Sequence, residues 1–124
     1  MNHLLAIAAG GALGAMGRYG VSQGVHSVLG RGFPYGTLTA NVLGSLLIGV
    51  LFVFLVERID ASPEWRAFLV VGFLGAFTTF SSFSLETMNL LTQGEAGKAM
   101  LNVVLSVSLC LVATWAGILL ARQF

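Results

Sequence analysis

The chain has 124 residues, of which 56% are hydrophobic and only 9% are charged, and its formal net charge is +1. An ordinary soluble domain carries roughly 25% charged residues, so this composition excludes one. The small net charge gives no electrostatic reason to expect a nucleic-acid partner, and the single cysteine, Cys110, excludes an internal disulfide. The sequence therefore predicts an integral membrane protein with a single domain over residues 1–124.

Apolar segments recur four times along the chain and are separated by short polar stretches. Residues 32–56, 67–85 and 99–121 carry no formal charge, and each run is close to the roughly 20 residues that a helix needs to cross a membrane. The first apolar segment is interrupted by Arg18, which we expect to stabilise the end of the first helix or a vestibule. We predict an all-α fold with four transmembrane helices over the following residues: 3–26, 34–57, 64–93 and 97–122.

Basic residues give almost no signal for the orientation of these helices. With four spans, both termini lie on the same side of the membrane as the loop over residues 57–66. This side carries three basic residues, Arg58, Arg66 and Arg122, and the other side carries two, Arg31 and Lys98. Arg18 adds a third to the other side if its side chain snorkels there. Because the positive-inside rule needs a clear asymmetry, the chain could insert both ways and pair as an antiparallel, dual-topology homodimer. A weak bias that fixes one orientation explains the same count about equally well.

Polar side chains follow one face of the second and of the fourth predicted helix. In the second helix, Thr37, Asn41 and Ser45 are spaced by four residues, which places them on one face. The fourth helix carries a ladder with the same spacing: Asn102, Ser106, Cys110 and Thr114. Single polar residues in membrane helices often only bond their own backbone or a neighbouring helix. A four-step ladder, which extends about 18 Å along the helix, favours a polar path.

The stretch GAFTTFSSFS, residues 75–84, combines five hydroxyl side chains with three phenylalanines. Phe77, Phe80 and Phe83 are three residues apart, and Thr79 and Ser82 form a neighbouring polar edge. Glycine and hydroxyl side chains can break a membrane helix and free carbonyl groups, which a cation can then bind. An unbroken helix whose phenylalanines only pack is the simpler alternative, and this stretch taken alone favours it.

The polar groups of these helices suit a small anion better than a cation. Asn41 and the serine and threonine hydroxyls are neutral donors, and a phenylalanine ring has an electropositive edge. A cation path would carry carboxylates or carbonyl groups along its length, whereas Glu86 is the one carboxylate available in this region. Four helices of one chain do not easily surround an aqueous path, so a transport function points to an oligomer.

Three motifs together resemble the bacterial fluoride channels, the Fluc or CrcB family. They are GGALGAMGRY at 10–19, GTLTANVLG at 36–44 and GFLGAFTTFSSFSLE at 72–86, and the resemblance covers the whole chain. It implies a passive channel in the bacterial cytoplasmic (inner) membrane, not an enzyme, that lets fluoride leave the cell and so gives fluoride resistance. It also implies an antiparallel homodimer with two pores, in which the third helix is broken in the middle of the membrane.

The same resemblance implies roles for individual residues. Main-chain carbonyl groups of Gly75 and Thr78 from both subunits would hold a structural Na⁺ at the centre of the dimer. The fluoride pathway would follow the phenylalanine edges and the polar tracks: Phe80, Phe83, Asn41, Thr37, Ser82, Asn102, Ser106, Cys110 and Thr114. Cys110 stands where a hydroxyl is usual, and a thiol is a weaker donor.

Two other classes of function would fit the small size of this membrane protein. A small dual-topology, proton-coupled drug exporter needs an embedded carboxylate, typically in its first helix, and the first predicted helix has no acidic residue. A non-conducting membrane assembly subunit would explain the size of the chain but not the two polar ladders. Efflux of fluoride and of chloride from liposomes would separate the three functions.

Overall fold

The computed structural model describes residues 2–124, with the backbone only for Asn2. Every regular element over these residues is a helix, and the described part of the chain contains no strand. Helices combine into four segments that are long and apolar enough to cross a membrane: His3–Leu29, Tyr35–Arg58, Pro63–Thr92 and Ala96–Arg122. The prediction of an all-α chain with four helices able to span a membrane is therefore confirmed.

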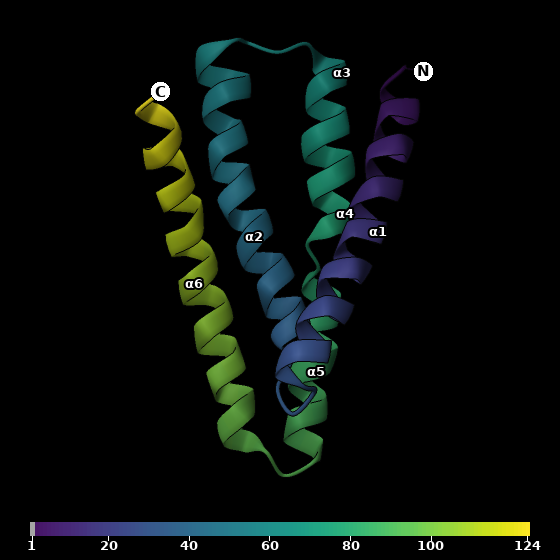
Figure 1. The fold of residues 1–124 in the computed structure, drawn as a ribbon, viewed down its shortest axis with the longest axis vertical. Helices are drawn as coiled ribbons and strands as arrows, with labels where there is room; N and C mark the ends of the chain where they lie inside the picture. The colour runs from purple at the N-terminus through teal and green to yellow at the C-terminus, as the bar shows by residue number, and fades with distance from the viewer. Residues whose placement is uncertain (1) are drawn as a thin grey trace.

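The four segments are not equally regular. The first is one helix, α1 (Asn2–Leu29), and the last is one helix, α6 (Ala96–Arg122). In the second segment, α2 (Tyr35–Phe52) continues into the π-helical η1 (Val53–Arg58). The third segment is made of four elements: α3 (Pro63–Arg66), the π-helical η2 (Ala67–Leu74), α4 (Gly75–Phe77) and α5 (Phe80–Thr92). Figure 1 shows both ends of the chain beside the connection between η1 and α3, with the other two connections at the opposite end of the bundle.

Glycines with a positive φ end two of the helices. The amide of Gly30 still donates to the His26 carbonyl at 2.8 Å, and the φ of +82° at Gly30 then turns the chain away from α1. The predicted end of the first helix at residue 26 was therefore too early, because α1 reaches Leu29. Gly94, with a φ of +80°, follows α5 in the same way. A left-handed φ at such positions favours glycine, which has no Cβ to clash with the backbone.

Glycines bring α1 and η2 into direct backbone contact. A Cβ at Gly10 would collide with the Phe68 carbonyl oxygen, and one at Gly14 would collide with the Phe73 carbonyl oxygen. Small residues spaced by four allow this close approach of two membrane helices. The Gly10-x-x-x-Gly14 pair therefore fixes the height at which α1 lies against the third span.

A second glycine contact joins α2 to α6, which lie next to each other in Figure 1. A Cβ at Gly49 would collide with the Thr114 carbonyl oxygen, and one at Gly117 would collide with the Leu46 carbonyl oxygen. Each helix thus presents a glycine to the backbone of the other. These two contacts hold the last helix against the polar face of the second.

We predict that Gly14→Ala destabilises the protein, because the added methyl group must displace the main chain of η2. Overpacking of this kind costs about 1–3 kcal/mol. The matched control is Gly20→Ala on the same helix, because a Cβ at this position would meet nothing within 4 Å. This control substitution should stabilise the helix slightly, since alanine favours a helix more than glycine does. The measurement is the midpoint of thermal unfolding in detergent. Equal midpoints for the two variants would show that the close contact between α1 and η2 is absent.

Candidate functional site

The third span is interrupted between α4 and α5. The helical conformation ends at Phe77 and resumes at Phe80, and the two residues between them are extended. Thr78 has φ −89° and ψ 157°, and Thr79 has φ −152° and ψ 120°. The interruption lies inside the stretch GAFTTFSSFS, so the hydroxyl-rich sequence and the loss of helix coincide.

Two threonine hydroxyls cap the helix ends on either side of the interruption. The Thr78 hydroxyl donates to the Leu74 carbonyl at 2.9 Å, and the Thr79 hydroxyl accepts from the Ser82 amide at 3.1 Å. Thr79 is therefore the N-cap of α5, a position at which a side-chain oxygen replaces a missing backbone partner. The Thr79 hydroxyl thus replaces a partner that the interruption removes from the Ser82 amide, whereas the Thr78 hydroxyl adds a second bond to the Leu74 carbonyl, which also accepts from the Thr78 amide at 3.0 Å.

Asn41, on α2, binds the interruption from a neighbouring helix. Its amide nitrogen donates to the Thr79 carbonyl at 3.0 Å, and its amide oxygen accepts from the Thr79 N–H at 2.8 Å. One side chain therefore satisfies both backbone groups of Thr79. The amide nitrogen keeps a second N–H, since a primary amide carries two.

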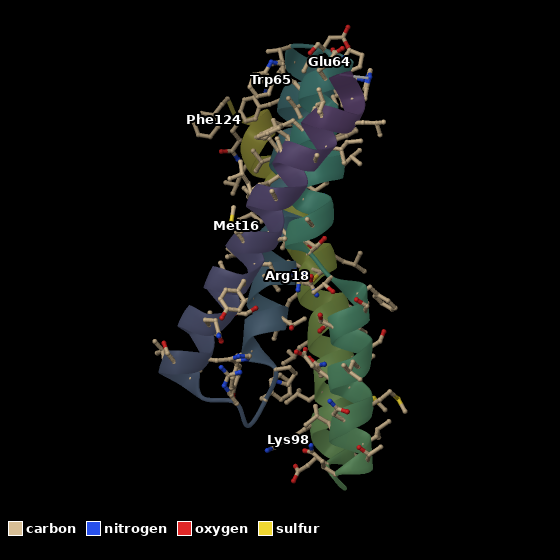
Figure 2. All side chains as sticks on the ribbon, turned by 90° about the vertical axis from the view of Figure 1, so that its right-hand side faces the viewer. Met16, Arg18, Glu64, Trp65, Lys98 and Phe124 are labelled. Atoms are coloured by element: carbon tan, nitrogen blue, oxygen red, sulfur yellow. The ribbon has the colours of Figure 1, made fainter. Side chains whose placement is uncertain are left out.

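Arg18, on α1, binds the interruption from the other side. Its Nε donates to the Ala76 carbonyl at 3.0 Å, and Figure 2 shows it near mid-height, between Glu64 at one end of the bundle and Lys98 at the other. Arg18 does not stabilise the end of the first helix, one of its two expected roles, because it lies inside α1, which continues to Leu29. Its role in a vestibule stays a prediction. A cation at membrane depth is normally held by backbone carbonyls or by other polar groups, and here a carbonyl at the end of α4 holds it.

An open groove of about 550 Å³ borders the interruption and is lined by residues of the last three spans. It brings together seven of the predicted site residues: Asn41, Gly75, Thr78, Phe80, Phe83, Ser106 and Cys110. Ser45, the third member of the polar stripe on the second helix, lines it as well. The groove therefore combines hydroxyl, amide, thiol and aromatic groups on a mostly apolar wall.

The three phenylalanines of the stretch lie in two different environments. Phe80 and Phe83 both line the groove, with ring centroids 5.3 Å apart and planes tilted by 47°, and Phe80 is 77% exposed. Phe77 is only 5% exposed and stacks on Phe73, with ring centroids 5.7 Å apart. Phe77 therefore packs in the core, whereas the other two rings are available to a ligand.

A chain of hydrogen bonds connects the groove to the interface between α5 and α6. The Ser106 hydroxyl donates to the side-chain oxygen of Asn102 at 3.4 Å, and the Asn102 amide nitrogen donates to the Thr87 hydroxyl at 2.9 Å. The Thr87 hydroxyl donates in turn to the Phe83 carbonyl at 2.7 Å. Asn102 is 2% exposed and does not line the groove. Thr87 was not among the predicted site residues, although it follows Phe83 by one helical turn.

Thr37 lies away from the groove, against Glu86. Its hydroxyl donates to Glu86 Oε2 at 3.0 Å, and Glu86 Oε1 is buried without a partner among the described residues. Glu86 also lines a second cavity, of about 420 Å³, together with Arg31 and Lys98. This cavity lies at the end of the bundle where α1 connects to α2 and α5 to α6. Glu95, which pairs with Lys98 at 3.6 Å, also lines it, so its lining combines two basic and two acidic side chains.

The structure also places Ser82 and Thr114 outside the lining of the groove. The Ser82 amide is bound by the cap of α5, and the Thr114 carbonyl lies against Gly49 in the contact between α2 and α6. Four of the predicted site residues are therefore not brought to the groove itself: Thr37, Ser82, Asn102 and Thr114.

The carbonyl groups of Gly75 and Thr78 lack the donors that a continuous helix would supply. In such a helix the Thr79 amide would bond to Gly75 and the Ser82 amide to Thr78. Here the Thr79 amide donates to Asn41, and the Ser82 amide donates to the Thr79 hydroxyl. Both residues line the groove, and residues 2–124 contain no group of three or more acidic, histidine or cysteine side chains that could hold a metal ion. The carbonyl groups of Gly75 and Thr78 therefore lie beside the groove without their helical donors.

Comparison with known proteins gives the family of the chain. The family model for "CrcB-like protein, Camphor Resistance (CrcB)" matches residues 5–118. The chain is similar to three proteins named "Fluoride-specific ion channel FluC". It is 56% identical to the one from Methylococcus capsulatus over 97% of this chain, 50% identical to the one from Coxiella burnetii over 99%, and 52% identical to the one from Geobacter sulfurreducens over 99%.

The coverage of these relatives differs. The chain spans 53% of the length of the Methylococcus protein but 99% of the lengths of the Coxiella and Geobacter proteins. The match to the family model covers nearly the whole chain and includes all three sequence motifs. The chain therefore belongs to the CrcB family, as the motifs predicted, and is a multi-pass membrane protein.

Proposed function

We propose that this chain forms a passive, fluoride-selective channel and is not an enzyme. The groove beside the interruption carries the proposal, because Phe80 and Phe83, whose ring edges are electropositive, line it together with Asn41. None of the described residues that line it is charged. A small anion would therefore be bound there by neutral donors and not by an ion pair with a basic side chain. The names of relatives that are 50% and 52% identical over nearly their whole length support fluoride as that anion.

Two copies in opposite orientations form the channel in this proposal. The groove is open on one side, and Phe80 and the polar side chains beside it would face lipid in a single chain. Polar groups at membrane depth normally face a protein interior or a water-filled cavity. An inverted second copy would cover both grooves and create two pores per dimer, with aromatic rings from both copies in each pore. The single four-helix domain of each copy, over residues 1–124, is then half of the channel.

A sodium ion at the centre of the dimer fits the two free carbonyl groups. Gly75 and Thr78 line the same groove, and in an inverted pair their oxygens from both copies would converge on one point. Main-chain carbonyls are established ligands of Na⁺ in membrane proteins whose helices are broken. The bound ion would supply a fixed positive charge, which favours an anion nearby in a medium of low dielectric constant.

The remaining polar residues extend the fluoride pathway in both directions from the groove. Ser106 and Cys110 line the groove, and Asn102 continues from Ser106 toward α5. Thr37, Ser82 and Thr114 stay predictions as pathway residues, since they lie outside the lining.

The physiological direction follows from the membrane potential. Across a bacterial cytoplasmic membrane, which is negative inside, the electrical free energy of an anion falls by about 2.3 kcal/mol per 100 mV when it leaves the cell. Hydrogen fluoride enters as a neutral molecule from acid surroundings and dissociates in the cytoplasm. A passive channel in the inner membrane therefore lowers cytoplasmic fluoride and gives fluoride resistance without an energy source.

The direct test is efflux from liposomes that contain the purified protein and are loaded with fluoride or with chloride. We expect rapid loss of fluoride, little loss of chloride, and no requirement for a proton gradient. A proton-coupled exporter would need the gradient, and a non-conducting assembly subunit would release neither anion. Equal efflux of both anions, or none of either, would contradict the proposal.

We predict that Phe80→Ile and Phe83→Ile each slow fluoride efflux about tenfold or more, since each 1.4 kcal/mol added to the barrier changes a rate tenfold. Isoleucine keeps most of the bulk but lacks the electropositive ring edge. The matched control is Phe52→Ile, which replaces an exposed ring that does not line the groove and should leave efflux unchanged. Efflux is measured per folded dimer. Full activity of both groove variants would show that these rings only pack.

A further inference from the structure

Gly44, on α2, forms a socket for the side chain of Thr78. Gly44 is buried, and a Cβ at this position would collide with the methyl carbon of Thr78. The next atoms that such a Cβ would meet are Phe77 Cδ2 at 3.4 Å and Thr78 Cβ at 3.7 Å, which are ordinary contacts. The collision at Gly44 therefore comes from one methyl group.

The Thr78 methyl group cannot easily turn out of the socket. The hydroxyl on the same Cβ donates to the Leu74 carbonyl at 2.9 Å, and a β-branched side chain has few accessible rotamers. Rotation about χ1 would move the methyl group but would break this hydrogen bond at the end of α4. A side chain at position 44 would instead displace the backbone of Thr78 and the carbonyl that it carries.

The first two spans hold the residues around Thr78 as well. Asn41, which precedes Gly44 by three residues on the same face of α2, binds both backbone groups of Thr79. Arg18, on α1, binds the Ala76 carbonyl at 3.0 Å. Three of the four residues from 76 to 79 are thus fixed by contacts within a single chain.

We propose that Gly44, together with Asn41 and Arg18, presets the interruption of the third span before a second copy or a cation binds. Gly44 acts as a positioning residue, because the space it leaves fixes the backbone of Thr78. The consequence for sodium rests on the proposed function: the backbone of Thr78 would be held in place before the ion binds, so little binding energy would be lost in ordering its carbonyl.

The test is Gly44→Ala, made both in the natural background and in the Thr78→Ser background. Serine keeps the hydroxyl of Thr78 but lacks the methyl group that fills the socket. The matched control is Gly17→Ala, whose Cβ would lie at an ordinary 3.5 Å from Phe77 Cδ1. Two quantities are measured for each protein: the midpoint of thermal unfolding in detergent, and the sodium concentration that supports half-maximal fluoride efflux.

In the natural background, we expect Gly44→Ala to lower the midpoint of thermal unfolding, because the added methyl group overpacks the socket. We also expect it to raise the sodium concentration for half-maximal efflux about tenfold, because the displaced Thr78 carbonyl would bind the ion more weakly. In the Thr78→Ser background, the same change should have little further effect on either quantity. Gly17→Ala should change neither. Loss of folded protein with Gly44→Ala alone, reversed by adding Thr78→Ser, would support the socket equally well.

Equal effects of Gly44→Ala in the two backgrounds would overturn the proposal, and so would the absence of an effect in the natural background. The proposal would also be overturned if Gly44→Ala failed to fold both in the natural background and in the Thr78→Ser background, because the defect would then not depend on the Thr78 methyl group. A parent protein that conducts no fluoride, or conducts it without sodium, would instead refute the proposed function. The thermal measurements would still decide whether the socket exists.

Discussion

The rest of this structure depends on how the chain satisfies its backbone where the third span loses its helical hydrogen bonds. Each unsatisfied polar group in hydrocarbon costs several kcal/mol, and an interruption at Thr78 and Thr79 creates several of them at once. Side chains supply partners for several of these groups. Asn41 bonds to both backbone groups of Thr79, Arg18 donates to the Ala76 carbonyl, and the Thr79 hydroxyl caps α5 by accepting from the Ser82 amide. Polar residues that look costly in so apolar a sequence are thus required by the interruption.

Glycines allow the helices to approach closely enough for those side chains to reach the interruption of the third span. Arg18 follows Gly14 by one turn, and Gly14 lets α1 lie directly on the backbone of η2. This close contact places the guanidinium beside the end of α4. On α2, Gly44 lies one turn beyond Asn41 and admits the Thr78 methyl group, so the same helix face both receives and binds the interrupted segment. The small residues of the GGALGAMGRY and GTLTANVLG motifs therefore serve the same purpose as the polar ones.

Much of the fold was predictable because hydropathy and charge alone define four spans. The environment of single residues was not predictable, because it depends on how the spans pack against each other. Phe77, Phe80 and Phe83 have the same chemistry and spacing, and only the extended residues 78 and 79 turn Phe77 toward the core and the other two toward the groove. The ladder from Asn102 to Thr114 was predicted as one face, yet a spacing of four turns about 40° around the helix with each step. Over three steps its ends face different neighbours: Asn102 lies against α5 and the Thr114 backbone against α2. The height of Arg18 was also undetermined, since its long side chain can reach several levels of the membrane.

Two carbonyl groups of residues that line the groove, Gly75 and Thr78, lose their helical donors, and this is the physical reason to expect an inverted second copy. The most direct measurement is the labelling of intact cells with a membrane-impermeant thiol reagent, after Cys110→Ser removes the natural thiol. Gln93→Cys and Gln123→Cys place single thiols at exposed positions at opposite ends of the bundle. The account predicts that about half of each variant reacts from outside, because a dual-topology protein presents both ends on both sides. Complete labelling of one variant with none of the other would contradict it.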